Sequence, residues 1–411
     1  MRAVLQALVA VCLCACCGPL AALAAEITLD DRYPEVNIWP GVTVLSDPGK
    51  QLTLAEARQR LAEFTMPTTA DSTLGQRRDA VWLRVPLSVS EASDGRWVFD
   101  VNYAVLNRMD LYLLGPDGQV LQQSRLGNTQ LTSDRPMPSR SHAVQLQFQP
   151  GKAHELWLRV ETVGGMIVPM TLSKDSTFLE RALYEQMLQG LLVGLGLCLI
   201  CYSLAQWLTL REPLLLKYAV LIGGGVLFSI VQFGIGAQFI WADVLWFELH
   251  LAPLAALMAA AGMSLFVEEA LREPDQPRWF GAVMKGIALF LALVGWAFAV
   301  GWIDVNAVSK VIGTVGLAPA LLGLPGALRR VRRGDSVGWY FIVAWLGYFI
   351  ATTIMVLLIR GVVPANAWTL HSFQMGTTLD MFLFLRVLAL RLHAVHELAL
   401  RTAHERDHAL S

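Results

Sequence analysis

Charged side chains are scarce in this 411-residue chain. Asp, Glu, Lys and Arg make up 16% of it, whereas hydrophobic residues make up 55%. With a mean hydropathy of +0.49, the chain is too apolar for an ordinary soluble protein of this length and is predicted to be a membrane protein. The formal net charge is −1, which excludes a general nucleic-acid binder because phosphates require a basic surface.

Cysteine is also scarce outside the N-terminus. Four of the six cysteines lie within the first 17 residues, and the other two are Cys198 and Cys201 in an apolar stretch. Residues 1–25 combine one early Arg, an apolar run and small residues at their end, which is typical of a secretory signal peptide. An uncleaved anchor is the alternative. Once the signal is removed, the exported part has no disulfide framework, so its own core must stabilise it.

Metal-binding patterns are absent as well. His142 and His154 each stand alone in the sequence, with no spacing that suggests a shared ion. We therefore predict no metal site, no cofactor and no catalytic residue.

Residues 26–175 show an alternation of apolar and polar side chains, which is the pattern of half-buried strands. The alternating sets lie at 81–89, 97–103, 109–113, 144–148 and 156–160. Turn-forming Gly and Pro residues separate them. Short strands joined by turns predict an antiparallel β-sandwich, preceded by one helix in "LTLAEARQRLAEF", residues 52–64.

Candidate ligand-binding residues lie on the opposite faces of these strands. Trp82 and Arg84 share one predicted strand, Trp157 and Arg159 share another, and Asn102 belongs to the same outward set. Trp beside Arg can stack on a sugar ring or hold an anion through two hydrogen bonds. In the alternative interpretation, this face packs on a loop or on the membrane region, with each Arg paired to Asp or Glu.

Long apolar runs replace the alternation from Leu188 onward. Seven runs approach the ~20 residues that a spanning helix requires. They lie at 187–209, 214–233, 248–268, 282–301, 306–326, 337–358 and 367–389. Lys and Arg concentrate in alternate connections, which favours the cytoplasm for those connections and for the C-terminus. We therefore predict a seven-helix transmembrane domain at 183–390.

A few polar residues and several glycines interrupt these apolar runs. Gln206, His371, Gln374 and Asp380 are predicted to form hydrogen bonds between helices. Glycines at 190, 194, 196 and 223–225 suit close helix packing. A transporter or channel would need a connected polar path and broken helices, and the small number of polar residues argues against that class.

The C-terminal tail, residues 391–411, is predicted to be a cytoplasmic helix. Leu388, Leu392, Val395 and Ala399 repeat at spacings of three and four, as in a weak coiled-coil seam. Such a helix can pair with a second copy, so a homodimer is one expectation. A solvated overhang is the alternative.

Several stretches together resemble the bacterial seven-transmembrane receptors with diverse intracellular signalling modules. Residues 182–220, 233–243 and 361–392 are similar to that family's membrane domain. The stretches "LTLAEARQRLAEF", "VWLRVPL", "NRMDLYL" and "ELWLRVET" are similar to its second type of extracellular domain, a jelly roll like those of carbohydrate-binding modules. The resemblance implies a periplasmic jelly-roll sandwich, a seven-helix bundle in the bacterial inner membrane and a cytoplasmic C-terminus.

In that family the last span continues into a cytoplasmic output module, commonly a diguanylate cyclase or a histidine kinase. The Gly-Gly-Asp/Glu-Glu-Phe run of a cyclase does not occur in this sequence, and "HELALRT", His396 to Thr402, lacks the Pro of a kinase phosphoacceptor box. We therefore expect a chain that is not an enzyme. It would sense a periplasmic small molecule or carbohydrate and signal to a cytoplasmic partner or output module. The alternatives are a transporter or channel with a periplasmic binding domain, and a membrane-anchored binding scaffold.

Overall fold

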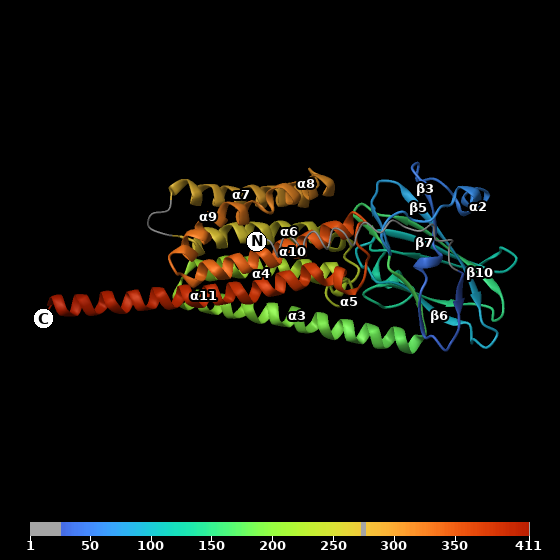
Figure 1. Ribbon diagram of the computed structural model, residues 1–411, viewed down its shortest axis with the longest axis horizontal. Coiled ribbons are helices and arrows are strands. Elements are labelled where there is room, and N and C mark those ends of the chain that lie inside the picture. The colour runs from blue at the N-terminus through green and yellow to red at the C-terminus, as the bar shows by residue number, and fades with distance from the viewer. Residues whose placement is uncertain (1–25, 273–276, 411) are drawn as a thin grey trace.

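A computed structural model describes residues 26–272 and 277–410, with side chains as far as Ala394. The expected signal peptide at 1–25 lies outside these residues. The strands gather at one end of the molecule and the long helices at the other, and α11 (Ala367–Leu410) extends past the remaining helices at the end far from the strands (Figure 1). We call the strand-rich part the β-domain, the helices the bundle, and the end of the bundle away from the β-domain its distal end.

Two main sheets form the β-domain. One has the order β1 (Ile27–Leu29), β5 (Ala80–Val89), β10 (Ala153–Glu161), β7 (Arg108–Leu114) and β8 (Val120–Leu126), with β3 (Thr43–Asp47) also paired to β5. The other has the order β2 (Glu35–Asn37), β12 (Met170–Ser173), β6 (Arg96–Val101) and β9 (His142–Gln147). A separate pair joins β4 (Thr73–Gln76) to β11 (Gly165–Ile167).

The apolar faces of these sheets form one buried core, which confirms the strand prediction. The alternating sets predicted from the sequence all belong to a single buried cluster that includes Leu83, Phe99, Leu111, Val144 and Leu158. Burial of each such side chain stabilises the fold by about 1.5–3 kcal/mol. This core therefore replaces the disulfides that the exported part lacks.

One detail of the strand prediction is wrong: the sandwich is not wholly antiparallel, because β1 runs parallel to β5. The helix predicted in residues 52–64 is present as α2 (Leu54–Gln59) and the short turn η2 (Leu61–Glu63), and it precedes the predicted strands. The sequence-based prediction missed β1, β2 and β3, which come before α2. Strands of three to five residues are too short to show a clear alternation, which is why the sequence did not reveal them.

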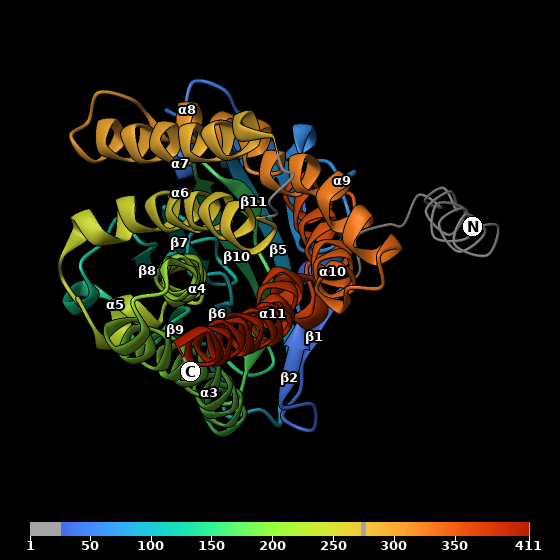
Figure 2. The ribbon, with the colours of Figure 1, turned by 90° about the vertical axis from the view of Figure 1, so that its left-hand side faces the viewer.

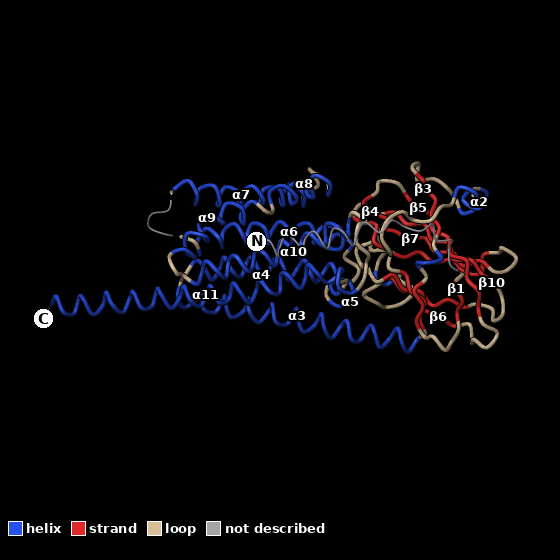
Figure 3. The backbone as a smooth tube through the Cα atoms, viewed as in Figure 1, coloured by secondary structure: helices blue, strands red, loops and turns tan. Residues whose placement is uncertain are grey.

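In the described residues, seven helical segments are long and apolar enough to span a membrane, as predicted. They are α3 (Asp175–Leu210), α4 (Pro213–Gln232), α6 (Leu245–Ala270), α7 (Arg278–Ala299), the pair α8 (Val305–Val315) and α9 (Ala318–Arg332), α10 (Ser336–Ile359) and α11. The short helix α5 (Ile235–Phe239) lies between α4 and α6. The helical and strand regions are separate along the molecule (Figure 3).

Helix α4 lies inside the bundle, next to α3, α6 and α11, whereas α7 and α8 lie on the outer side of α6 (Figure 2). Glycine allows close approach of two helix backbones: a Cβ on Gly224 of α4 would lie 2.4 Å from the amide nitrogen of Ala259 on α6. The packing prediction therefore holds for Gly224. It is wrong for Gly190 and Gly194, because no described atom lies within 4 Å of a Cβ built on either.

Candidate signal-transmission site

The predicted ligand-binding face of the large sheet is covered. Trp82 and Trp157 are 1% and 0% exposed. They pack with Leu45 and Leu114 of the sheet, and Ala57 and Phe64 of the segment 52–64 cover them. The ring of Phe64 meets Trp157 edge-on at a centroid distance of 5.3 Å. In this conformation both indole rings are therefore packed beneath a covering segment, which was the alternative to ligand binding. The amphipathic pattern of residues 52–64 was the signal that a helix covers this face.

The two arginines of this face are paired with acidic side chains. Arg84 forms an ion pair with Glu155, whose second oxygen accepts a hydrogen bond from Trp157 Nε1 at 2.9 Å. Arg159 donates to the carbonyl of Lys50 at 2.9 Å and lies 3.8 Å from the carboxylate of Asp110. Ligand binding by Trp82, Arg84, Trp157 and Arg159 stays a prediction, and it requires the covering segment to move.

Asn102 lies apart from these four residues, at the junction with the bundle. It follows β6, and its Oδ1 accepts a hydrogen bond of 2.7 Å from Nη2 of Arg140. Arg140 precedes β9, is 5% exposed and donates through Nη1 to the carbonyl of Phe233 at the end of α4. Burial lowers the pKa of the Arg140 guanidinium, and the neighbouring Glu185 carboxylate, 3.8 Å away, opposes that shift. Sequence reasoning missed Arg140, because no periodicity marks a single loop residue.

Helix α3 continues directly from β12, and only Lys174 separates the two elements. The Lys174 ammonium pairs with Asp31 at 2.6 Å and with Asp94 at 2.7 Å, and it lies 4.4 Å from the centroid of the Trp97 ring. Partial burial acts to raise the pKa of Asp31, but its bonds to Lys174 and Ser93 outweigh this and lower the pKa. The bond to Lys174 also lowers the pKa of Asp94. These contacts fix the first residue before α3 to the β-domain.

The second turn of α3 is also fixed to the β-domain. Arg181 pairs with Glu35 at 2.7 Å and with the buried Asp100 at 2.9 Å. Burial raises the pKa of Asp100, and Arg181 counteracts that shift. The first turns of α3 therefore move with the β-domain as one body.

One face of α3 carries polar residues at every fourth position, namely Arg181, Glu185 and Gln189, which align along the helix. Glu185 Oε1 lies 2.8 Å from Nε2 of His371 on α11. Gln189 and Gln374 exchange two amide hydrogen bonds of 3.1 and 2.7 Å.

We call this set the polar seam. It comprises Asp100, Asn102, Arg140, Arg181, Glu185, Gln189, His371 and Gln374. Along α3, the first seam residue, Arg181, bonds to the β-domain, whereas Glu185 and Gln189 bond to α11. The seam therefore connects the β-domain to the helix that leads into the tail.

The prediction of interhelical hydrogen bonds is thus confirmed for His371 and Gln374. Asp380 is 6% exposed, and its Oδ1 has no hydrogen-bond partner among the described residues. Gln206 likewise forms no side-chain hydrogen bond in the part of the chain that the structure describes.

The turn between α10 and α11 provides another connection. The amide of Ala70 donates to the carbonyl of Gly361, and the amide of Ala365 donates to the carbonyl of Asp71, both at 2.9 Å. Gly361 has φ +75, a left-handed conformation that favours glycine. Leu358, near the end of α10, is fully buried in the core cluster of the β-domain. The end of α10 and the turn that leads into α11 are therefore bonded to the β-domain.

This architecture, a β-sandwich bonded to seven apolar helices, is that of a multi-pass membrane protein with an extracellular domain. A family model described as 7TM diverse intracellular signalling matches residues 185–391, and one described as 7TMR-DISM extracellular 2 matches residues 40–174. The chain belongs to the 7TMR-DISM family of membrane receptors, as the sequence resemblance predicted. A search of curated proteins found no match.

We expect His142 to make the stability of the β-domain depend on pH. Its side chain is buried, Nε2 lies 3.0 Å from the carbonyl oxygen of Ala104, and burial lowers the pKa of its imidazole to about 3. Because the folded state binds the proton more weakly than the unfolded state, stability is fully present above about pH 6.5 and falls as the pH drops toward 3. We expect a loss of about 2 kcal/mol between pH 6.5 and 5 from this group alone.

The variant His142→Gln should abolish that part of the pH dependence, because Gln does not titrate and keeps a donor for Ala104. Thermal unfolding of the purified protein at pH 9.0, 8.0, 6.5 and 5.0 measures it. Between pH 8 and 9 both proteins should show the same slope, which serves as the control. An equal loss of Tm at pH 5 in both proteins would contradict the assignment.

Because Gln189 and Gln374 bond to each other, we expect substitutions of the two residues to have non-additive effects on the free energy of unfolding. Gln189→Leu or Gln374→Leu alone leaves one buried amide unpaired and should cost about 1–2 kcal/mol. The double variant removes both amides and should recover most of that stability. A double-mutant cycle measured by thermal unfolding checks this, with Gln123→Leu at an exposed position of β8 as a neutral control. Additive losses would show that the two amides do not interact.

Proposed function

We propose that this receptor senses a small molecule with its β-domain and transmits the event along α3 and α11 to a cytoplasmic signalling protein or output module. A carbohydrate is one candidate ligand, because the sequence resembles sandwich domains that bind sugars. In this proposal the chain itself is not an enzyme. The observation that supports it is the polar seam, through which the β-domain and α3 bond to α11.

The seam suits transmission because its bonds are directional. A hydrogen bond weakens steeply when its geometry changes, so α3 cannot slide or rotate against α11 without exchanging partners. A ligand shifts such an equilibrium only by its differential affinity for two arrangements. Movement of the segment over Trp82 and Trp157 is one event that would provide this difference.

Charge distribution supports an orientation with the β-domain in the periplasm of a bacterium and α11 entering the cytoplasm. Arg329, Arg330, Arg332 and Arg333 lie at the end of α9, and Arg272 and Arg278 flank the connection between α6 and α7. These ends are distal, and basic residues favour the cytoplasmic side. A reporter that is active only in the cytoplasm should be active when it is fused after Ser411. A reporter that is active only in the periplasm should be active when it is inserted at Gly118. Both fusions on one side of the membrane would contradict the orientation.

The break between α8 and α9 is the observation that favours a transporter instead. A broken helix can expose backbone groups to a substrate. Here, however, the last turn of α8 before the break contributes Ile312 and Val315 to an apolar cluster. The buried members of that cluster are Leu257, Leu291, Phe298 and Val308. Substrate transport requires a polar path, so the break supports a bend in the fifth span rather than a binding site.

Transmission predicts that a change in the β-domain alters the distal part of α11. Asp100→Asn removes the charge that Arg181 pairs with, and we expect faster hydrogen exchange at residues 386–394 of the full-length protein in lipid nanodiscs. The double variant Gln189→Leu/Gln374→Leu should abolish this response while it stays folded. Asp117→Asn, at an exposed turn of the same domain, is the matched control. Unchanged exchange in Asp100→Asn would favour a simple anchored scaffold.

A further inference from the structure

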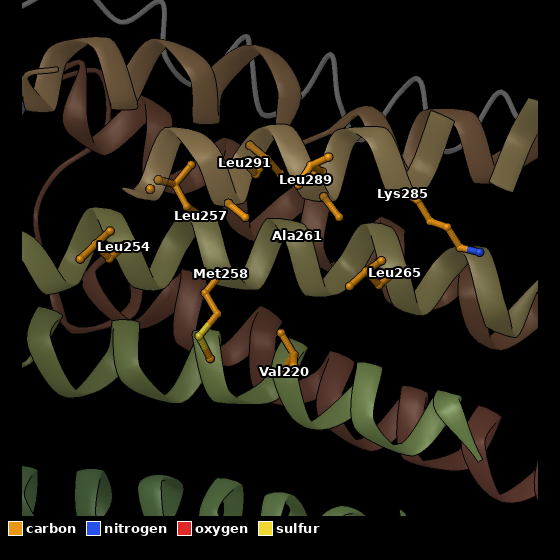
Figure 4. A pocket seen from close by; sticks show the side chains of 12 residues that line it. Val220, Leu254, Leu257, Met258, Ala261, Leu265, Lys285, Leu289 and Leu291 are labelled. Carbon is orange, nitrogen blue, oxygen red and sulfur yellow. The ribbon is translucent and has the colours of Figure 1, made fainter. Parts of the chain in front are cut away.

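An apolar groove runs along the bundle between α4, α6 and α7. It has a volume of about 580 Å³ and is open to one side. Figure 4 shows Val220 of α4, Leu257 and Met258 of α6 and Leu289 of α7 around it. Lys285 of α7 is the charged member among its described lining residues. The seam and the β-domain contribute no residue to this groove.

The groove has the dimensions and the surroundings of a site for an acyl chain. From Lys285 to Gly295 the lining follows α7 for ten residues, which corresponds to about 15 Å of helix. That length is half of the hydrocarbon thickness of a bilayer, about 30 Å. Because α4, α6 and α7 are spanning helices, the open side of the groove faces lipid chains and not water. A chain that enters the groove fills it along one leaflet.

The distal end of the groove carries excess positive charge. Lys285 Nζ lies 3.6 Å from Glu268, but Glu268 is also paired with Lys217 at 2.7 Å and with Arg272 at 3.4 Å. Lys217 and Arg272 both pair with Glu269 as well. Within residues 26–272 and 277–394, three cationic side chains thus share two carboxylates, which leaves one positive charge unbalanced among these described groups.

The two cations nearest the lipid are accessible. The side chains of Lys285 and Arg272 are 56% and 57% exposed. Lys285 lies two turns inside α7, where a charge facing lipid is costly unless it is paired or reaches the headgroup region. An anionic headgroup would provide the missing negative charge at this position.

We propose that this groove binds an anionic glycerophospholipid, with one acyl chain between α4, α6 and α7 and the phosphate beside Lys285 and Arg272. The site adjoins the output helix, because Arg391 of α11 donates to the carbonyls of Glu269 and Arg272 at 3.3 and 3.2 Å. A bound lipid therefore contacts the same end of α6 that holds α11.

Native mass spectrometry of the full-length protein measures this binding directly, with phosphatidylglycerol and phosphatidylethanolamine of identical acyl chains as probes. We expect tighter binding of phosphatidylglycerol, and Lys285→Gln should weaken it about fivefold, the effect of one Lys near anionic lipid. Ala292→Phe should reduce binding of that lipid by filling the groove. These measurements do not depend on any signalling output.

Matched controls separate the site from general effects. Lys310→Gln removes an exposed Lys on α8, and Ala282→Phe enlarges an exposed Ala of α7 outside the groove; neither should change binding. Thermal unfolding confirms that each variant is folded. Equal affinity for both lipids would overturn the headgroup assignment, and unchanged binding in folded Ala292→Phe would overturn the groove. Preference for a free fatty acid over phosphatidylglycerol would also overturn the proposal.

Discussion

The pairing of buried polar groups at the junction determines how the two halves of this molecule are joined. Arg140, Gln189 and Gln374 are buried, and the side chain of Glu185 is only 14% exposed. Buried polar groups need hydrogen-bond partners, and these groups provide them for one another. The β-domain, α3 and α11 each supply a part of this set. Hydrogen-bond geometry therefore specifies the relative positions of these three parts. Apolar packing alone is not directional enough to specify them.

Packing and polar bonding have different roles in this architecture. Alternating apolar residues from both sheets build a core that extends to Leu358 at the end of α10. Aromatic side chains such as Tyr218, Phe266 and Phe341 form a second cluster within the bundle. These clusters supply most of the stability, since each large buried side chain contributes more than a typical hydrogen bond. The polar seam contributes directional contacts between the parts that the two clusters stabilise.

The sequence was sufficient for the architecture because both of its signals are strong and periodic. Alternation over ten residues, as in β5, and apolar runs of about 20 residues identify strands and spans without knowledge of their neighbours. Short strands such as β1 and β2 carry no such period. Their pairing with β5 and β12 depends on chain closure over many residues.

The site was harder to predict than the fold for a related reason. An outward side chain of one sheet is exposed only if nothing covers it, and residues 52–64 cover Trp82 and Trp157. Arg140 and Glu185 are 45 positions apart and meet only after β9, β10 and β12 have folded. Gln374 was recognised because a polar residue in a span signals a partner, although its partner Gln189 was not identified.

The direct junction of β12 with α3 has a mechanical consequence. A helix of 36 residues is about 54 Å long and bends little. With no flexible linker at its origin, and with Lys174 and Arg181 both bonded to the β-domain, α3 follows any tilt of the sandwich as a stiff lever. A small tilt of the sandwich would therefore displace the far end of α3 by several ångströms.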